Sequence, residues 1–592
     1  MKRRFVLLGG LALVGLIAGG AVHRHWNRAA PVAALAVHYL RTLSLPAGTI
    51  QTETAASGDA GVPLSPATAA AEQTTGPDDG DWPSYNKTLT SNRFSRLSQI
   101  NRDTVGRLKV LCVYDTGQYT GFTSGLIEVN GALIGTTAFD IFSLDPADCR
   151  QNWRTHEDYP PATPANVNRG AAYLDGKLFR GTQDGRVLAY DFSTGRRLWA
   201  TTVADPSKGE TVPAAPIAWN GLVFVGNAGG DFKGVKGRMY ALDADSGRIV
   251  WEFYLVPKSD DDAPRGPQGA TPLDMSTWKN APGSPVTGGA TWTSYTLDPA
   301  TGLLYVPGGN PAPDFTTAPR EGENLYSGSV IVLDARTGAY ANHIKVVPRD
   351  WHDWDVSSPP ALIRTRGGRT VLSVAPKDGH LYGFDPATNA LLYRTPATRI
   401  ANADVPFSPE KGVHFCPGSL GGSEWNGPAY DPGTNLVLIG EVDWCTWVTL
   451  QTPSQIQATR PGQPWSGQAG INPFDTWGSQ DPVGRWAGWV HAIDADTGAW
   501  TWRAKTNYPI LSGLTPTAGG IVLFGDMGGN FYALDAANGR TLWGGKIGGA
   551  IGGGVITYLA NGTQKIAVAA GLTAVLWPTE ITTAKVVILG LE

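Results

Sequence analysis

The chain has 592 residues, a formal net charge of −4 and 17% charged residues, and it is rich in glycine (75), proline (43) and tryptophan (21). Such a length means either several domains or one large repetitive fold. The absence of a basic stripe argues against a nucleic-acid-binding protein, and the glycine and proline content favours short strands joined by tight turns.

The N-terminal residues predict export. Lys2-Arg3-Arg4 precedes an apolar run from Phe5 to Val22, and a basic segment followed by a hydrophobic one is typical of a signal peptide or membrane anchor. The length of the run lies between those of the two, so residues 1–22 are either a cleaved signal or an anchor in the inner membrane. The basic flank stays cytoplasmic, so the bulk of the chain is translocated, and a single apolar run excludes a multi-helix membrane form.

Residues 23–80 are rich in Ala, Thr, Gly and Pro and predict a flexible linker. Within them, 31–45 could form a short amphipathic helix, whereas the part from Glu53 to Asp81 has no period and almost no large apolar residues. The globular part, 81–592, is expected to begin near Asp81-Trp82.

From there the chain repeats one pattern: small residue, any residue, Asp, two residues, Thr or Ser, Gly, three residues, Trp. Clear copies lie at 189–199, 241–251, 492–502 and 533–543, and 143–153 is a weaker copy with Cys149 in the glycine position. Each copy predicts a strand, a tight turn and a second strand. The turn aspartates are mostly 41 to 63 residues apart, which is the size of a four-stranded propeller blade.

These repeats predict an all-β fold, an eight-bladed β-propeller with tryptophan-docking repeats. The tryptophan that ends each repeat should pack between adjacent blades. The last strand, 585–591, should pair with a strand near the start and close the ring.

The four cysteines are Cys112, Cys149, Cys416 and Cys445. None lies in a CxxC or CxxCH motif, so the sequence supports neither a zinc ribbon nor a covalently attached haem. In an exported protein an even number suggests disulfides, and sequence order makes Cys112–Cys149 and Cys416–Cys445 the natural pairs. Four buried free thiols are the alternative.

The segment Trp351-His352-Asp353-Trp354-Asp355 holds three ionisable side chains between two indoles. A carboxylate beside tryptophan is partly desolvated, which raises its pKa toward a range where it can accept a proton. The alternative is a surface loop with solvated acids. The glycine-rich stretch 225–234 leads into a strand and not a helix, so it is not a phosphate loop, but its Asp231 could approach a metal.

Seven segments, in order, resemble the PQQ-dependent (quinoprotein) alcohol dehydrogenase family, haem-less type, where PQQ is pyrroloquinoline quinone. They are Trp82-Pro-Ser-Tyr85 with Arg93 to Asn101, Asn168-Arg169-Gly170, Ala290-Thr-Trp292, Gly308-Gly-Asn310-Pro311, His352-Asp-Trp-Asp355, Ala375-Pro-Lys377-Asp-Gly379 and Cys416-Pro-Gly418.

The resemblance implies a funnel on the ring axis that holds PQQ beside Ca²⁺. It implies that Asp231, Asn310 and Asp355 are metal ligands, and that Asp355 is also the catalytic base. Lys377 would be the catalytic, cofactor-binding cation at the reactive carbonyl of PQQ. Arg169 would bind a PQQ carboxylate, and the indole of Trp292 would lie under the quinone. Each of these residues could instead be an ordinary turn or packing residue.

The chain departs from the family pattern at several positions. Asp231 stands where the family usually has Glu, and Pro213 and Phe122 replace a threonine and a glutamate near the cofactor. The adjacent-cysteine pair is absent, where this chain has Ala165-Asn-Val167. Lanthanide-using relatives carry a second Asp two residues after the base; Ser357 stands there, so Ca²⁺ is favoured.

The function that the resemblance implies is a periplasmic dehydrogenase that oxidises a small-molecule alcohol to an aldehyde or ketone by hydride transfer to PQQ. Ca²⁺ would be the Lewis acid and Asp355 the base. Without CxxCH, electrons must pass to an external periplasmic cytochrome c or a membrane quinone. The alternatives are a PQQ aldehyde or sugar dehydrogenase, and a non-catalytic propeller that serves as a scaffold or in envelope assembly, which would need the repeat tryptophans but not Asn310, Asp355 and Lys377 together.

Overall fold

The computed structural model describes residues 48–55, 80–160, 167–268, 275–470 and 475–592. The predicted signal or anchor, 1–22, and most of the predicted linker lie outside these residues. In the described ranges no helix is both long enough and apolar enough to span a bilayer.

The regular structure is almost entirely antiparallel sheet, in meanders of four strands. The first sheets comprise β4 (Ile127–Val129), β5 (Ala132–Thr136), β6 (Asp140–Leu144), β7 (Gln151–His156); β9 (Ala172–Leu174), β10 (Lys177–Gly181), β11 (Arg186–Asp191), β12 (Arg197–Thr202); β13 (Ile217–Trp219), β14 (Leu222–Gly226), β15 (Arg238–Asp243), β16 (Ile249–Tyr254); and β18 (Thr296–Asp298), β19 (Leu303–Pro307), β21 (Ser329–Asp334), β22 (Tyr340–Lys345).

The later sheets follow the same plan. They comprise β23 (Ala361–Arg364), β24 (Thr370–Val374), β25 (His380–Phe384), β26 (Leu391–Pro396); β28 (Ala429–Asp431), β29 (Leu436–Asp443), β32 (Ala487–Asp494), β33 (Trp500–Thr506); β34 (Thr515–Pro516), β35 (Ile521–Gly525), β36 (Asn530–Asp535), β37 (Thr541–Lys546); and β38 (Val555–Ala560), β39 (Thr563–Ala570), β40 (Lys585–Leu591) with β2 (Leu108–Asp115).

Smaller elements lie between these sheets. They are the parallel pair β3 (Gly121–Gly125) and β8 (Val167–Gly170), the pair β17 (Lys279–Asn280) and β20 (Arg320–Glu321), the three strands β27 (Val413–Phe415), β30 (Thr446–Val448) and β31 (Ser479–Gln480), and the helix α3 (Pro453–Ala458).

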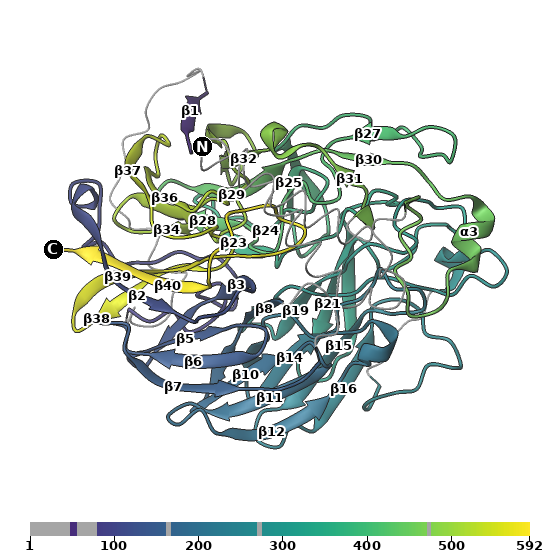
Figure 1. Cartoon of the computed structure of the whole chain (residues 1–592), viewed down its shortest axis with the longest axis horizontal. Helices are drawn as coiled ribbons and strands as arrows, with labels where there is room; N and C mark the ends of the chain where they lie inside the picture. The colour runs from purple at the N-terminus through teal and green to yellow at the C-terminus, as the bar shows by residue number, and fades with distance from the viewer. Residues whose placement is uncertain (1–47, 56–79, 161–166, 269–274, 471–474) are drawn as a thin grey trace, which may run out of the picture.

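The sheets follow one another around a common centre in chain order (Figure 1), from the blue early strands through teal and green to the yellow final ones. The last strand lies beside the first large one, because β40 pairs with β2 along its whole length, from Leu108 opposite Leu591 to Asp115 opposite Lys585. The expected pairing of 585–591 with an early strand is therefore confirmed.

Adjacent sheets are joined by the repeat tryptophans. The indole of each of four tryptophans donates a hydrogen bond at 2.9–3.1 Å to a backbone oxygen in or just after the turn of the next sheet: Trp153 to Phe192, Trp199 to Ala244, Trp251 to Ala335 and Trp502 to Ala536. The glycine of that turn has positive φ and lies against the indole, as Gly338 does against Trp251, where a side chain would be strained and crowded. The predicted docking role is confirmed for these tryptophans.

Both expected disulfides are present. Cys112–Cys149 connects β2 to the turn between β6 and β7, and Cys416–Cys445 connects the segment after β27 to the segment before β30. No free cysteine is present in the described residues.

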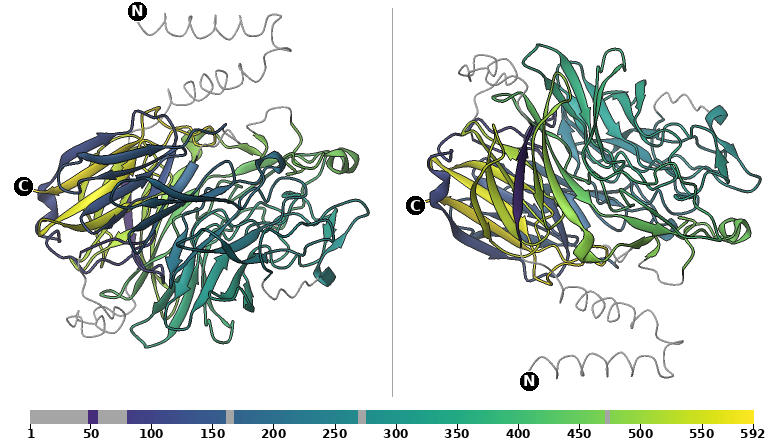
Figure 2. Two further views of the ribbon diagram at one scale, coloured as in Figure 1. Left: turned by 90° about the horizontal axis from the view of Figure 1, so that it is seen from below. Right: turned by 90° about the horizontal axis from the view of Figure 1, so that it is seen from above.

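One strand lies within the range that the sequence assigns to a linker. β1 (Ile50–Thr54) pairs antiparallel with β33, from Ile50 opposite Thr506 to Thr54 opposite Trp502, and adds a fifth strand to that sheet. Figure 2 shows it in purple beside the green strands. The alternating Thr and Glu of this segment are exposed, which suits an edge strand and carries no hydrophobic signal.

Candidate active site

The predicted base and the predicted cation form a buried ion pair. Asp355 lies in the segment between β22 and β23, and Lys377 follows β24. The two residues are 3% and 5% exposed, respectively. The Lys377 Nζ lies 2.8 Å from Asp355 Oδ2 and 3.4 Å from Asp353 Oδ2. Burial alone would lower the pKa of Lys377, but the carboxylates of Asp353 and Asp355 raise it well above its usual value.

The two other predicted metal ligands adjoin this pair. The backbone N–H of Asn310 donates to Asp355 Oδ1 at 2.8 Å. A side chain at Gly309 would place its Cβ 2.6 Å from the same oxygen, so the approach requires glycine. Burial and the charge of Asp355 raise the pKa of Asp231 to about 6, against the opposing effects of Lys377 and of hydrogen bonds from Trp477 and Asn310. The structure thus brings Asp231, Asn310 and Asp355 together.

Arg169, on β8, lies between two indoles. Its guanidinium carbon is 4.8 Å from the ring centre of Trp292 and 4.3 Å from that of Trp425. Its Nε donates to the backbone oxygen of Trp292 at 3.1 Å, while its Nη1 is buried without a hydrogen-bond partner in the described residues. Burial lowers the pKa of Arg169 to about 10. Lys377 Nζ lies 5.5 Å from the Trp292 ring, which links this layer to the ion pair.

Three acidic residues to which the sequence assigns no role also lie near this site: Asp314, Asp353 and Glu424. The carboxylate oxygens of Asp314 and Asp353 lie within 4.8 Å of each other and of one on Asp231. Burial raises the pKa of Glu424 to about 7, although Lys377 and Arg169 oppose the shift. Only Asp353 had a local signal, as part of the segment 351–355; Asp314 and Glu424 follow recognised segments by a few residues, without a pattern of their own.

The positions that depart from the family pattern have structural roles here. The Pro213 carbonyl accepts the backbone N–H of Arg169 at 2.9 Å, and Phe122 is buried in an apolar core cluster with Trp82. The Ser357 hydroxyl donates to the backbone oxygen of Ser423 at 2.6 Å. Ala165 lies outside the described residues.

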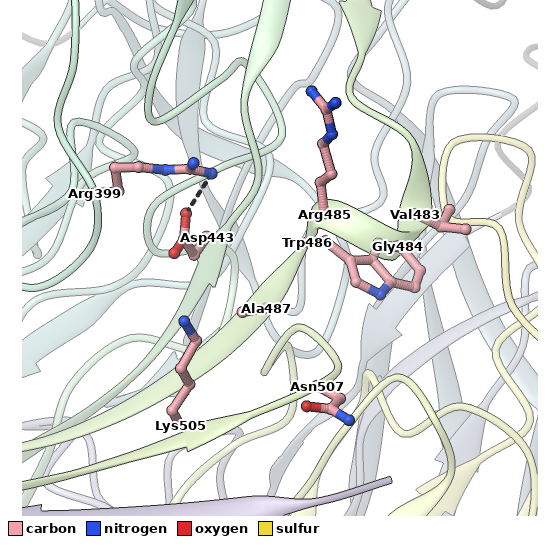
Figure 3. A pocket seen from close by; sticks show the side chains of 9 residues that line it. All are labelled: Arg399, Asp443, Val483, Gly484, Arg485, Trp486, Ala487, Lys505 and Asn507. Atoms are coloured by element: carbon pink, nitrogen blue, oxygen red, sulfur yellow. Dashed lines mark ion pairs between the residues drawn. The ribbon is translucent and has the colours of Figure 1, made fainter. Parts of the chain in front are cut away.

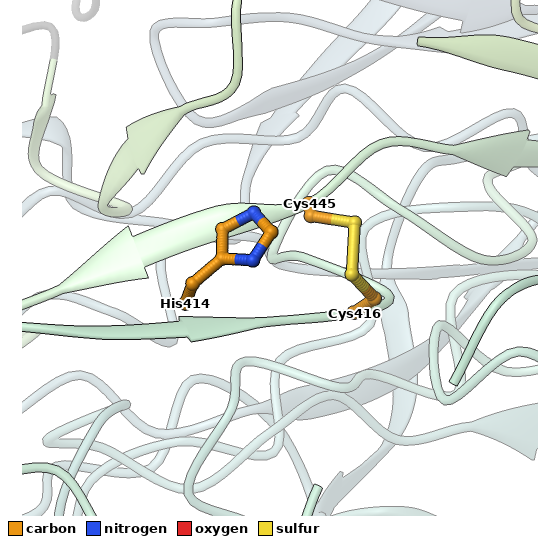
Figure 4. A group of neighbouring side chains, drawn as sticks. All are labelled: His414, Cys416 and Cys445. Atoms are coloured by element: carbon orange, nitrogen blue, oxygen red, sulfur yellow. A yellow bond between two sulfur atoms is a disulfide. The ribbon is translucent and has the colours of Figure 1, made fainter. Parts of the chain in front are cut away.

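Two other groups are separate from this site. His414 lies beside Cys416 and Cys445 (Figure 4), but both sulfurs are in the disulfide, so neither is a thiolate ligand. A pocket near the ends of β29, β32 and β33 (Figure 3) is lined by Arg399, Arg485 and Lys505 and includes the 3.0 Å ion pair between Arg399 and Asp443. It contains none of the predicted site residues.

Two family models match different parts of the chain. The PQQ family model, described as "Glucose/ethanol/alcohol dehydrogenase, beta-propeller domain", matches residues 82–407, and the model of the outer membrane protein assembly factor BamB matches residues 487–586.

Individual relatives agree with the first of these models. The dehydrogenase subunit of alcohol dehydrogenase (quinone) from Gluconobacter oxydans is 31% identical, over 83% of this chain and 70% of the relative. A lanthanide-dependent methanol dehydrogenase from Methylacidiphilum fumariolicum is 30% identical, over 83% of this chain and 85% of the relative. The solved quinohemoprotein alcohol dehydrogenase from Pseudomonas putida superposes with a TM-score of 0.77 at 26% identity, covering 87% of this chain and 80% of that one.

The fold is therefore an all-β propeller, as the repeats predict. The chain belongs to the PQQ-dependent alcohol dehydrogenases, oxidoreductases that act on the CH–OH group with PQQ and a metal ion.

Proposed function

We propose that the chain is a periplasmic quinoprotein with eight blades that oxidises an alcohol to an aldehyde or ketone, using PQQ and Ca²⁺ as a Lewis acid. The single observation that carries the proposal is the contact of Lys377 with Asp355, 2.8 Å from Nζ to Oδ2, beside Asn310 and close to Trp292. A non-catalytic scaffold would need the repeat tryptophans but not this buried arrangement.

The acidic residues fit a hard cation. Asp231, Asn310 and Asp355 offer oxygen ligands, which Ca²⁺ prefers. Burial and the charge of Asp355 raise the pKa of Asp231 to about 6, and a bound cation would lower it again and stabilise the ionised form. We propose these three residues as the metal ligands.

The aromatic and basic residues fit a flat polycarboxylate cofactor. The unpartnered Nη1 of Arg169 is suited to a carboxylate, and Trp292 offers an indole face beside it. When bound, PQQ supplies the acceptor for the hydride that leaves the alcohol carbon. Lys377 would place its positive charge beside the cofactor, where it stabilises negative charge that develops on an oxygen.

Asp355 is proposed as the base that takes the hydroxyl proton of the alcohol. Lys377 and the Asn310 N–H each hold one of its oxygens, so its orientation is set before the substrate binds. The four cysteines are in disulfides and none lies in a CxxCH motif; we propose a periplasmic cytochrome c or a membrane quinone as the electron acceptor. The N-terminal segment 1–22 would direct export or attach the protein to the inner membrane.

The test is reconstitution of the purified chain with PQQ and Ca²⁺, with an artificial dye as acceptor and a panel of primary and secondary alcohols. Dye reduction should require both additions, and Asp355→Asn should lower the rate by about 10²–10⁴-fold. Asp378→Asn is the matched control, because this buried carboxylate is bonded to Tyr382 and not to Lys377. Failure of the chain to bind PQQ would contradict the proposal.

A further inference from the structure

A cavity of about 490 Å³ outside the proposed active site is lined by three basic side chains (Figure 3), and its size is typical of a small-molecule site. Arg399 forms a 3.0 Å ion pair with Asp443, which is the only acidic residue of the lining. Arg485 and Lys505 are exposed and have no acidic partner within the described ranges. Three positive charges against one negative charge favour an anionic ligand.

The cavity lies at the same end of the propeller as the proposed active site. In a four-stranded antiparallel meander, the second and fourth strands end at the same end of the sheet. Asp443 ends β29, the second strand of its sheet, and Lys505 lies near the end of β33, the fourth. Lys377 likewise follows β24, the second strand of the preceding sheet. An apolar cluster connects the two places, because it contains Trp486 of the cavity and Trp292 packs against it.

The N-terminal part of the chain joins the propeller beside this cavity. β1 runs antiparallel to β33, so it begins at the end where β33 finishes. The backbone N–H of Asn507, which lines the cavity, donates to the carbonyl oxygen of Thr49 at 3.3 Å. The predicted signal or anchor, 1–22, precedes this point in the sequence. An anchor in the inner membrane would therefore tether the propeller at this end.

Two exposed apolar side chains lie close to the cavity. Ile400, next to Arg399, is 38% exposed, and Trp447, on β30, is 48% exposed. Their segments flank β27, because the Asn402 side chain donates to the backbone oxygen of His414 at 2.7 Å and Trp447 lies opposite His414. Tryptophan and aliphatic side chains beside basic ones are typical of surfaces that bind the interface of an anionic membrane.

We propose that the cavity binds the phosphate group of an anionic phospholipid, with Ile400 and Trp447 in the interfacial layer beside it. The planar guanidinium groups of Arg399 and Arg485 suit phosphate oxygens, and the negative surface potential of an anionic leaflet attracts Lys505. The active-site end of the propeller then faces the membrane. This inference deepens the proposed function and rests on it, since a membrane quinone that accepts the electrons would lie at that same end.

The first test places a polarity-sensitive fluorophore on the full-length chain in vesicles. The native cysteines are all in disulfides, so Ile400→Cys supplies the single free thiol. Its emission should shift to shorter wavelength in vesicles of phosphatidylcholine with phosphatidylglycerol, and much less in phosphatidylcholine alone. Ser193→Cys is the matched control, because Ser193 is exposed in the turn between β11 and β12, at the other end of the propeller.

The control position should respond to neither kind of vesicle. Equal shifts at the two positions would overturn the orientation, because the lipid surface would then contact both ends of the propeller. Equal shifts of the Ile400→Cys label in the two kinds of vesicle would overturn the role of lipid charge.

The second test is titration calorimetry of the full-length chain, held in a non-ionic detergent, with dihexanoyl phosphatidylglycerol. Arg485→Gln and Lys505→Gln should each weaken binding about fivefold. Arg196→Gln should stay within twofold of wild type, because this exposed arginine lies in the turn between β11 and β12. Unchanged affinity in both cavity variants would overturn the assignment of the cavity.

Inorganic phosphate and dihexanoyl phosphatidylcholine are the other two titrants. Phosphate lacks the apolar contact with Trp447, and phosphatidylcholine has no net charge, so each should bind more weakly than phosphatidylglycerol. Trp447→Ala should weaken the binding of phosphatidylglycerol and leave that of phosphate within twofold. Phosphate binding as tight as that of phosphatidylglycerol would assign the cavity to free anions and overturn the lipid.

Neither test requires PQQ or an alcohol, so the two proposals can fail separately. Dye reduction that needs PQQ and Ca²⁺, in a chain whose Ile400→Cys label ignores phosphatidylglycerol, would refute this inference alone. A lipid response that depends on Arg485 and Lys505, in a chain unable to bind PQQ, would refute the proposed function alone.

Discussion

The position of Arg169 between two indoles predicts a specific loss on replacement by lysine. Its Nη1 is free to donate, while its Nε is engaged with the Trp292 backbone oxygen at 3.1 Å. Lysine keeps the positive charge but lacks the planar guanidinium group, whose carbon lies 4.8 and 4.3 Å from the ring centres of Trp292 and Trp425. The loss of one charge-assisted hydrogen bond costs about 1.5–3 kcal/mol, so Arg169→Lys should raise the dissociation constant of PQQ about 10- to 150-fold.

The assay is a titration of PQQ into the purified chain at saturating Ca²⁺, followed by quenching of tryptophan fluorescence. Arg180→Lys is the matched control, because this buried guanidinium donates to the backbone oxygens of Asp140 and Ala138. The control should lower the thermal midpoint and leave PQQ affinity within twofold. Wild-type affinity in Arg169→Lys, or an equal loss in Arg180→Lys, would refute the role assigned to Arg169.

Two further predictions concern stability. Burial lowers the pKa of His491 from its usual 6.5 to about 4. Between these two pH values the unfolded chain binds more protons than the folded one, so the free energy of unfolding falls as pH drops from about 6.5 through 4, by about 3 kcal/mol in full. His491→Gln should remove this loss, and thermal midpoints of wild type and variant that run parallel across this pH range would contradict the prediction. Gly338→Ala places a Cβ 2.5 Å from the Trp251 ring, whereas Gly368→Ala, also at positive φ, meets nothing within 4 Å. The Gly338 variant should therefore have a lower free energy of unfolding than the Gly368 variant, by about 1–3 kcal/mol. An equal decrease of the thermal midpoint in both variants would show that the Trp251 side chain moves away at no cost.

Most of the fold could be predicted from local pattern. The Asp, Thr and Gly of each turn form their hydrogen bonds within a few residues, as when Asp191 Oδ1 accepts from the backbone N–H and the hydroxyl of Thr194. Such contacts depend only on nearby sequence. β1 could not be predicted in this way, because an exposed edge strand with polar side chains has the composition of a linker.

The site could be predicted only where a recognisable segment carried each residue. Asp231, Asn310, Asp355 and Lys377 were expected together and lie together. Asp314 was not expected, because its proximity to Asp231 arises from the packing of two separate sheets and not from any spacing along the chain.

The pairing of β2 with β40 also determines when the sheet that contains β2 can be completed during synthesis of the chain. A nascent chain that has completed β2 must wait for Lys585–Leu591, which at 5–20 residues per second takes on the order of 25–95 s. β2 carries Val110, Leu111 and Val113, which are at least 36% exposed even when the strand is paired. A chain interrupted before Lys585 would leave β2 and β39 with open edges, so quality control would meet premature termination products as aggregation-prone sheets and not as slightly shortened proteins.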